Sequence, residues 1–130
     1  MKSIRRSDRE ITFQDARDIL DNAEYGILST VGKDGQPYGV PLSYVYKNDS
    51  IYFHCALSGH KLDNIEHCAK VSFCVVGSTK VLPDKFATEY ESALVFGVAS
   101  EVKEAERHDV LLWLLEKYCP DFIDEGKMYI

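Results

Sequence analysis

The chain has 130 residues, of which 45% are hydrophobic, and its formal net charge is −6. This length suits one domain, residues 1–130, and the hydrophobic share excludes an intrinsically disordered chain. An acidic balance argues against a nucleic-acid partner and against binding to an anionic membrane surface. No apolar run approaches the length of a membrane span, and residues 1–6 form no apolar signal segment, so we expect a cytoplasmic protein.

Local sequence signals predict the order of helices and strands. Thr12 followed by Asp15 is typical of a helix N-cap, and Asp34-Gly35 between two apolar runs favours a hairpin. The expected helices cover 13–23, a short segment from 58, and 104–118; the expected strands cover 25–31, 38–46, 51–56, 71–76 and 92–102. This order predicts a mainly β domain, a small antiparallel barrel with helices packed outside it.

Four parts of the chain carry more specific expectations. Strand 71–76 is apolar enough to be buried on both faces, and Trp113 lies off the apolar stripe of the last helix. Residues 77–90 contain Pro83 and show no clear period, which is typical of a long loop with a functional or partner-binding role. The apolar residues 128–130 predict the start of a strand that this sequence does not contain.

The cysteines do not form a recognisable metal or redox motif. There are four, with no CxxC pair among them: Cys55, Cys68, Cys74 and Cys119. His54 and His67 each precede a cysteine, but adjacent residues on a strand face opposite ways and no second close pair completes a tetrahedral set. We therefore expect buried thiols and no metal site.

The first turn of the short helix carries an unusual charge. His60 and Lys61 would lie at the positive end of the helix dipole, where a cation is unfavourable unless an anion sits between it and the free backbone N–H groups. A phosphate group does this well. The alternative is a solvated lysine on a short surface helix.

A proline interrupts the second expected strand. Pro41 removes one donor from the strand ladder, so the segment 39–46 is an edge, a bulge or a surface that faces a ligand. The alternative is an edge strand in which the proline only blocks aggregation.

Several segments, in this order along the chain, resemble the flavin-binding split-barrel family that includes pyridoxamine 5′-phosphate oxidase, and its nitroimidazole-resistance (Nim-type) branch more closely. The matching residues are Gly26-Ile27-Leu28-Ser29-Thr30, Pro37-Tyr38, Val40-Pro41-Leu42-Ser43-Tyr44, Tyr52-Phe53-His54, Gly59-His60-Lys61, Tyr90-Glu91-Ser92 and Phe96-Gly97. The resemblance implies an antiparallel split β-barrel that binds FMN. It also implies a homodimer with a flavin site at each side of the subunit interface.

The resemblance assigns site residues by position. Along the isoalloxazine and ribityl chain it places Val40, Pro41, Leu42, Ser43 and Tyr44, mainly through their backbone groups. It places Phe53 and His54 beside the flavin, His60 and Lys61 at the phosphate, and Glu91 and Ser92 as contacts from the partner subunit. An open site also leaves room for FAD.

Two departures from the family pattern stand out. Gly39 and Tyr44 replace the arginine and lysine that flank this strand in the vitamin oxidase, which argues against oxidation of pyridoxamine phosphate. The family's C-terminal strand is missing or cut short after Ile130.

These residues lead to one functional hypothesis and three alternatives. The hypothesis is an FMN-dependent reductase of small acceptors such as nitroaromatic (5-nitroimidazole) compounds, in which His54 donates a proton or orients the substrate. Alternatively, His54 is a structural histidine hydrogen-bonded in the barrel wall. The whole protein could also be a non-enzymatic flavin-binding redox sensor or store. Haem handling, with His54 or His60 as an axial ligand, is the third alternative.

Overall fold

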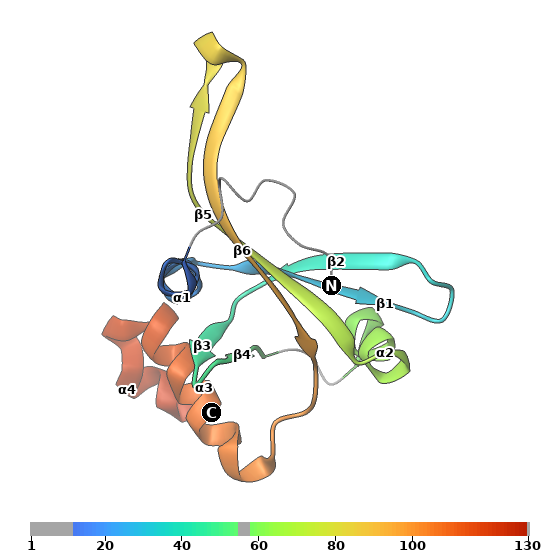
Figure 1. Ribbon diagram of the computed structural model, residues 1–130. Helices are drawn as coiled ribbons and strands as arrows, with labels where there is room; N and C mark the ends of the chain where they lie inside the picture. The colour runs from blue at the N-terminus through green and yellow to red at the C-terminus, as the bar shows by residue number, and fades with distance from the viewer. Residues whose placement is uncertain (1–11, 55–57, 130) are drawn as a thin grey trace.

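The computed structural model describes residues 12–54 and 58–129. It contains a four-stranded antiparallel sheet in the order β2-β1-β5-β6 and a separate two-stranded sheet of β3 and β4 (Figure 1). The strands are β1 (Gly26–Val31), β2 (Pro37–Leu42), β3 (Val45–Lys47), β4 (Ser50–Tyr52), β5 (Lys70–Leu82) and β6 (Ala87–Val98). The helices are α1 (Phe13–Asn22), α2 (His60–His67), α3 (Glu104–Tyr118) and α4 (Ile123–Gly126). The predicted antiparallel split barrel with flanking helices is confirmed.

Helix α1 begins where the sequence predicts. The backbone N–H of Asp15 donates to the Thr12 hydroxyl oxygen at 3.1 Å, which satisfies one of the free donors of the first turn. Farther along the helix, Ile19 and Leu20 are buried against the sheet, and the helix ends before Ala23. No helix in 12–54 or 58–129 is long and apolar enough to cross a membrane.

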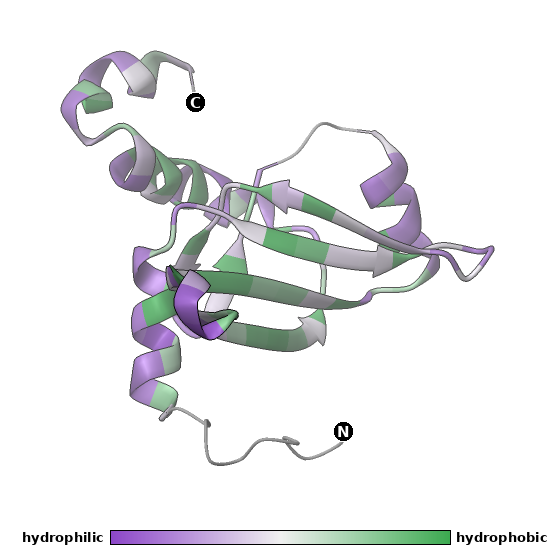
Figure 2. Cartoon of the chain, turned by 90° about the horizontal axis from the view of Figure 1, so that it is seen from above, coloured by the Kyte–Doolittle hydropathy of each residue, from purple (hydrophilic) through white to green (hydrophobic). Residues whose placement is uncertain are grey.

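The four-stranded sheet has one buried and one open face. The core lies between the sheet, α1 and the end of β2, and its buried members are Ile19, Leu20, Leu28, Tyr44, Phe73, Val75 and Ala93. The opposite face exposes apolar side chains that recur every second residue on β6, namely Leu94, Phe96 and Val98. Hydrophobic stretches run along the strands in Figure 2. The expectation that strand 71–76 is buried on both faces is therefore wrong within one chain, where Val76 is half exposed.

The second expected strand breaks in two. It was predicted as one strand over 38–46, but β2 ends at Leu42 and β3 begins at Val45 in the other sheet. Between them Tyr44 turns into the core, where it is completely buried and its ring meets the Phe73 ring edge-on at 4.9 Å. A buried tyrosine needs a partner for its hydroxyl, and this one donates to the backbone carbonyl of Leu20 at the end of α1.

The backbone of Tyr44 is held by the end of α3. Its N–H donates to the hydroxyl of Tyr118 at 3.0 Å, and its carbonyl accepts from the Lys117 ammonium at 3.0 Å. The same ammonium lies 3.8 Å from the centroid of the Tyr44 ring, a cation–π contact. Burial raises the pKa of Tyr44 and lowers the pKa of Lys117, and Asp21 partly opposes the second shift. One residue at the strand break thus joins α1, α3 and the core.

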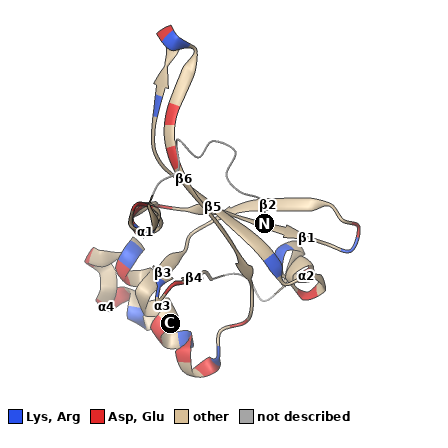
Figure 3. Ribbon diagram, viewed as in Figure 1, with Lys and Arg blue, Asp and Glu red and all other residues tan. Residues whose placement is uncertain are grey.

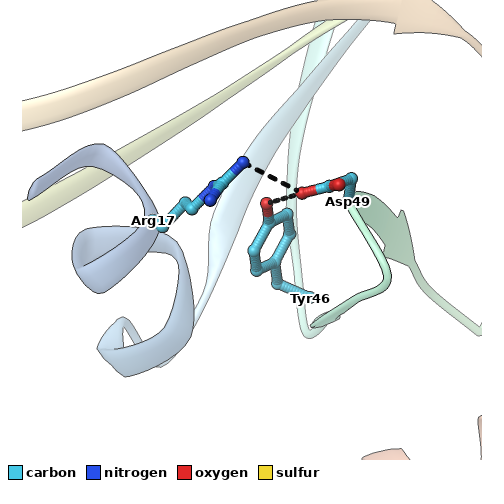
Figure 4. A network of polar contacts seen from close by, with 3 residues as sticks. All are labelled: Arg17, Tyr46 and Asp49. Atoms are coloured by element: carbon cyan, nitrogen blue, oxygen red, sulfur yellow. Dashed lines mark hydrogen bonds and ion pairs between the residues drawn. The ribbon is translucent and has the colours of Figure 1, made fainter. Parts of the chain in front are cut away.

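The β3–β4 hairpin contacts both neighbouring helices. Figure 4 shows Asp49, in its turn, accepting a hydrogen bond from Tyr46 at 3.0 Å and facing Arg17 of α1 at 3.5 Å. Burial and the Asp49 carboxylate together raise the pKa of Tyr46. On the side of α3, Trp113 is half-buried with its ring 5.6 Å from that of Tyr52. Trp113 therefore packs within the chain.

Residues 77–90, predicted as a loop, form a long β-hairpin arm. Strands β5 and β6 pair from Lys70↔Val98 out to Leu82↔Ala87, with one irregularity between Val76 and Thr79. A 3₁₀ turn over Pro83–Lys85 closes the arm, and it ends on Phe86 in the left-handed region at φ 51°. Both faces of the arm are exposed, so its strands lack the alternating pattern that marks a half-buried strand. The arm extends from the body of the sheet in Figure 1.

Other expected boundaries also shift. The strand predicted over 92–102 is β6 and ends at Val98, while the strand predicted over 51–56 is β4 and ends at Tyr52. Residues 55–57, with Cys55, lie outside the described residues. At the C-terminus, Lys127–Tyr129 is a 3₁₀ helix, so the strand expected from 128 is wrong for the described part, and Ile130 lies outside it.

Helix α2 lies close against the turn end of β1. The Asn64 amide donates to the Thr30 hydroxyl at 3.0 Å, and both side chains are buried. A Cβ on Gly32 would stand 2.5 Å from Oδ1, the side-chain amide oxygen of Asn64. Glycine at this position therefore allows the helix to approach the hairpin.

We expect Gly32→Ala to lower the free energy of unfolding by about 1–3 kcal/mol, because the added methyl must displace a buried, hydrogen-bonded amide. Urea denaturation followed by circular dichroism measures the change. Gly97→Ala is the matched control, since a Cβ there meets no atom within 4 Å and the backbone needs no positive φ. Equal stability of the two variants would contradict close packing of α2.

Candidate functional site

A cleft of about 230 Å³ lies between the edge strand β2 and the first turn of α2. Its lining is Tyr38, Val40, Pro41, Ser58, Gly59, His60, Lys61 and Leu62. The strand supplies one wall, which includes Val40 and Pro41, and the helix start supplies the other. Two segments about 20 residues apart in sequence thus meet at one place.

The helix wall presents backbone N–H groups that have no acceptor inside the helix. Gly59 is the N-cap residue at φ 146° and ψ 174°, and it has no side chain to accept a hydrogen bond from the first turn. The first intrahelical bond runs from Asp63 N–H to Gly59 C=O at 3.0 Å, so the N–H groups before Asp63 have no acceptor inside the helix. Among the residues that the structure describes, other than its two chain neighbours, none lies within 4 Å of where a Gly59 Cβ would be. This open N-terminus favours an anion.

Lys61 brings a positive charge to the same turn. Its side chain is half-buried, and its ammonium lies 5.8 Å from the centroid of the Phe53 ring. Phe53 is itself half-buried and packs against the core just after β4. This contact places the predicted site residues Phe53 and Lys61 beside each other.

His60 stacks on Tyr38 across the cleft. The ring centroids are 4.1 Å apart and the ring planes differ by 18°. One helical turn farther, Asn64 donates to Thr30, which pairs with Tyr38 in the β1–β2 ladder. Two contacts on one face of α2 therefore hold the helix start against one rung of the sheet.

The chemistry of the lining suits a phosphate group with an apolar neighbour. It combines a lysine, a histidine, free N–H groups and a serine hydroxyl with an apolar strand, and none of the eight residues is acidic. Charged residues elsewhere gather on the helices and hairpin tips, and the central strands are mostly uncharged (Figure 3). In a protein with a net charge of −6, the residues that line this cleft thus include the cationic Lys61 and no carboxylate, although Asp63 lies in the same helical turn.

The structure brings four of the predicted site residues into this cleft: Val40, Pro41, His60 and Lys61. The remaining strand residues lie elsewhere. Leu42 is half-buried against the core, Ser43 is exposed at the strand break, and Tyr44 is in the core with its polar groups already bonded. Their assignment to the flavin stays a prediction.

The other predicted residues are outside the cleft lining. His54 is exposed immediately after Phe53. Glu91 and Ser92 are exposed on β6, and the Glu91 carboxylate accepts from the Ser78 N–H across the arm at 3.4 Å. A contact from these two residues to a flavin site would have to be made in another subunit, as the resemblance implies.

Sequence reasoning missed Tyr38 in the cleft, and it also missed the structural role of Lys117 at the strand break. Tyr38 was only part of a matching motif, although its even register with Val40 and Leu42 puts it on the same side of β2. The role of Lys117 could not be predicted from the sequence. A lysine in the last turn of a helix is usually solvated and interacts favourably with the negative end of the helix dipole. Only the approach of α3 to the strand break shows its role.

Comparison with known proteins agrees with this architecture. The sequence profile of the pyridoxamine 5′-phosphate oxidase family matches residues 13–127. No curated protein matches the chain closely enough to count as a relative.

Several solved structures share the fold. A conserved hypothetical protein from Mycobacterium tuberculosis is 24% identical with a TM-score of 0.81, over 98% of this chain and 76% of its own. A proposed 5-nitroimidazole antibiotic resistance protein from Bacteroides thetaiotaomicron is 22% identical with a TM-score of 0.74, over 86% and 69%. An FAD- and haem-binding protein from Mycobacterium smegmatis is 19% identical with a TM-score of 0.73, over 89% and 58%. At these identities the likeness establishes the fold.

Proposed function

This chain belongs to the pyridoxamine 5′-phosphate oxidase family of flavin-binding split barrels, and on that premise we propose that it binds FMN and reduces small acceptors such as nitroaromatic compounds. The observation that carries the proposal is the cleft in which Val40 and Pro41 of β2 face His60 and Lys61 of α2. An apolar strand beside a cationic helix start suits a planar ring system that ends in a phosphate. A protein of the same fold with a proposed role in 5-nitroimidazole resistance supports the acceptor class.

The residues of the cleft would divide the work of binding. Lys61, the His60 ring and the free N–H groups of the first turn of α2 would hold the phosphate. The backbone from Val40 to Tyr44 would run beside the ribityl chain and the ring, with Leu42 and Ser43 between them. The flavin, when bound, supplies the electron transfer, and the protein supplies position and electrostatics.

His54 is the proposed proton donor or substrate-orienting residue. It is exposed and follows Phe53, whose ring is 5.8 Å from the Lys61 ammonium. The exposed His54 side chain would be open to a second molecule. Imidazole suits this task because it exchanges protons near neutral pH.

A homodimer would complete the site. The open face of the sheet exposes Leu94, Phe96 and Val98 at alternate positions of β6. Large apolar surfaces of this kind often mark protein–protein interfaces. A second copy covering this face would also bring the partner's β6, with Glu91 and Ser92, towards the first subunit. The resemblance to the family suggests the homodimer, and the exposed apolar residues of β6 support it.

We expect the purified protein to have twice the mass of one chain by light scattering. Phe96→Glu should shift it towards the monomer, because the charge would be buried in the interface. Phe122→Glu changes a similarly exposed phenylalanine away from this face and should leave the dimer intact. A monomeric wild-type protein would exclude the shared site.

Flavin binding is tested by the visible spectrum after incubation with FMN and desalting. Lys61→Ala should weaken FMN binding by about 1.5–3 kcal/mol, roughly 10- to 150-fold, because it removes a hydrogen bond to a charged group. Riboflavin, which lacks the phosphate, should bind both proteins equally. The control is Lys33→Ala in the exposed β1–β2 turn, which should change neither affinity.

The spectrum also separates the alternatives. A two-banded flavin spectrum that survives desalting supports the proposal, whereas a Soret band after incubation with haem and no flavin uptake would favour haem handling. The second candidate has the support of the haem-binding protein that shares this fold. Uptake of neither would contradict both.

Catalysis is tested by how fast the reduced flavoprotein is reoxidised by a nitroimidazole under anaerobic conditions. We expect reoxidation faster than in buffer alone, and a loss of about a hundredfold or more in His54→Ala if this residue donates the proton. FMN affinity should be unchanged in that variant, and His108→Ala on α3 is the control. A nitroimidazole without effect on wild type would point to a flavin sensor or store.

A further inference from the structure

We propose that Tyr38 is a positioning residue that holds the His60 imidazole for the ligand's phosphate and so raises the preference for a phosphorylated flavin over riboflavin. The inference rests on the proposed function. It adds a role for Tyr38, to which the resemblance assigns none, and a preference of the cleft for FMN over riboflavin.

The stack fixes the plane of the His60 ring. A histidine on the exposed first turn of a helix would ordinarily sample several rotamers, but here its ring lies 4.1 Å from the Tyr38 ring at an interplanar angle of 18°. Stacking between aromatic rings is attractive and favours this one ring orientation. The imidazole is therefore ordered before a ligand arrives.

The stack leaves the hydrogen-bonding edge of His60 available. Ring nitrogens donate in the plane of the ring, so a partner above the face covers the apolar surface without using a donor. Within the described part of the chain, no hydrogen bond to a His60 ring nitrogen is present. Both Tyr38 and His60 line the cleft together with Lys61. The free edge can thus serve an anion in the same cleft.

Both partners of the stack stand on rigid supports. Tyr38 pairs with Thr30 in the β1–β2 ladder, and Thr30 accepts the buried hydrogen bond from Asn64, four residues after His60. The paired residues Thr30 and Tyr38 therefore each contact α2, Thr30 through the hydrogen bond from Asn64 and Tyr38 through the stack on His60. The order of His60 comes from the sheet and does not depend on the ligand.

Preorganisation predicts a selective effect. FMN and riboflavin differ only in the phosphate, so a loss in the ordering of His60 should weaken FMN and leave riboflavin almost unchanged. Immobilising a free side chain on binding costs about 0.5–1.5 kcal/mol, which corresponds to about two- to tenfold in affinity. A general weakening of the cleft would instead lower both affinities together.

The test measures FMN and riboflavin dissociation constants by flavin fluorescence for wild type, Tyr38→Leu, Tyr38→Phe, His60→Ala and the double variant Tyr38→Leu/His60→Ala. Leucine keeps apolar volume on this side of β2 and removes the ring, while phenylalanine keeps the stack. We expect the riboflavin-to-FMN ratio of dissociation constants to fall about two- to tenfold in Tyr38→Leu and to be retained in Tyr38→Phe. In the His60→Ala background, Tyr38→Leu should cause no further fall.

The outcomes separate this inference from the function on which it rests. If wild type prefers FMN and Lys61→Ala removes that preference but Tyr38→Leu does not, the positioning role is wrong and the phosphate site stands. A fall in the ratio that persists in the His60→Ala background would also overturn it, since Tyr38 would then act independently. If wild type binds FMN no better than riboflavin, the proposed phosphate site itself fails. Circular dichroism of each variant confirms that folding is not the cause.

Discussion

The burial of Tyr44 is the constraint on which the rest of the structure depends. Its ring fills the core beside Phe73, and its hydroxyl is bonded to the end of α1. Its N–H and carbonyl, which a continuous strand would have paired in the sheet, are bonded to Tyr118 and Lys117. Buried backbone groups must be satisfied, so α3 can replace the strand ladder at this point. The strand therefore breaks, and the split between the two sheets follows.

The break at Tyr44 also shapes the candidate site. Because β2 leaves the sheet there, the chain makes the short β3–β4 hairpin and returns to start α2 beside the edge of β2. Asn64 and the Tyr38–His60 stack then hold α2 on the ladder. One wall of the cleft is the edge strand β2, in which Pro41 has no N–H to donate, and the other is a helix start whose N-cap makes no side-chain hydrogen bond.

One face of the four-stranded sheet is buried within the chain, and apolar side chains on the other face are exposed. Leu28, Phe73 and Val75 fill the inner face of the sheet, while Leu94 and Phe96 stay exposed on the other. A sheet that carries apolar side chains on both faces normally has both faces covered. The outer face of the four-stranded sheet therefore exposes apolar surface that one chain does not cover.

The sequence alone determined the elements that depend on neighbouring residues. These are the Thr12 cap, the β1–β2 hairpin, α3, and the position of His60 and Lys61 in the first turn of a helix. Each depends on residues within a few positions of one another. The tertiary structure alone decided the strand break and the hairpin arm. The break at Tyr44 depends on Lys117 and Tyr118, more than 70 residues away, and the arm is stabilised by pairing between strands that bury little apolar surface. The contact between Tyr38 and His60 also depends on the tertiary structure, because only the packing of α2 against the sheet brings the two rings together.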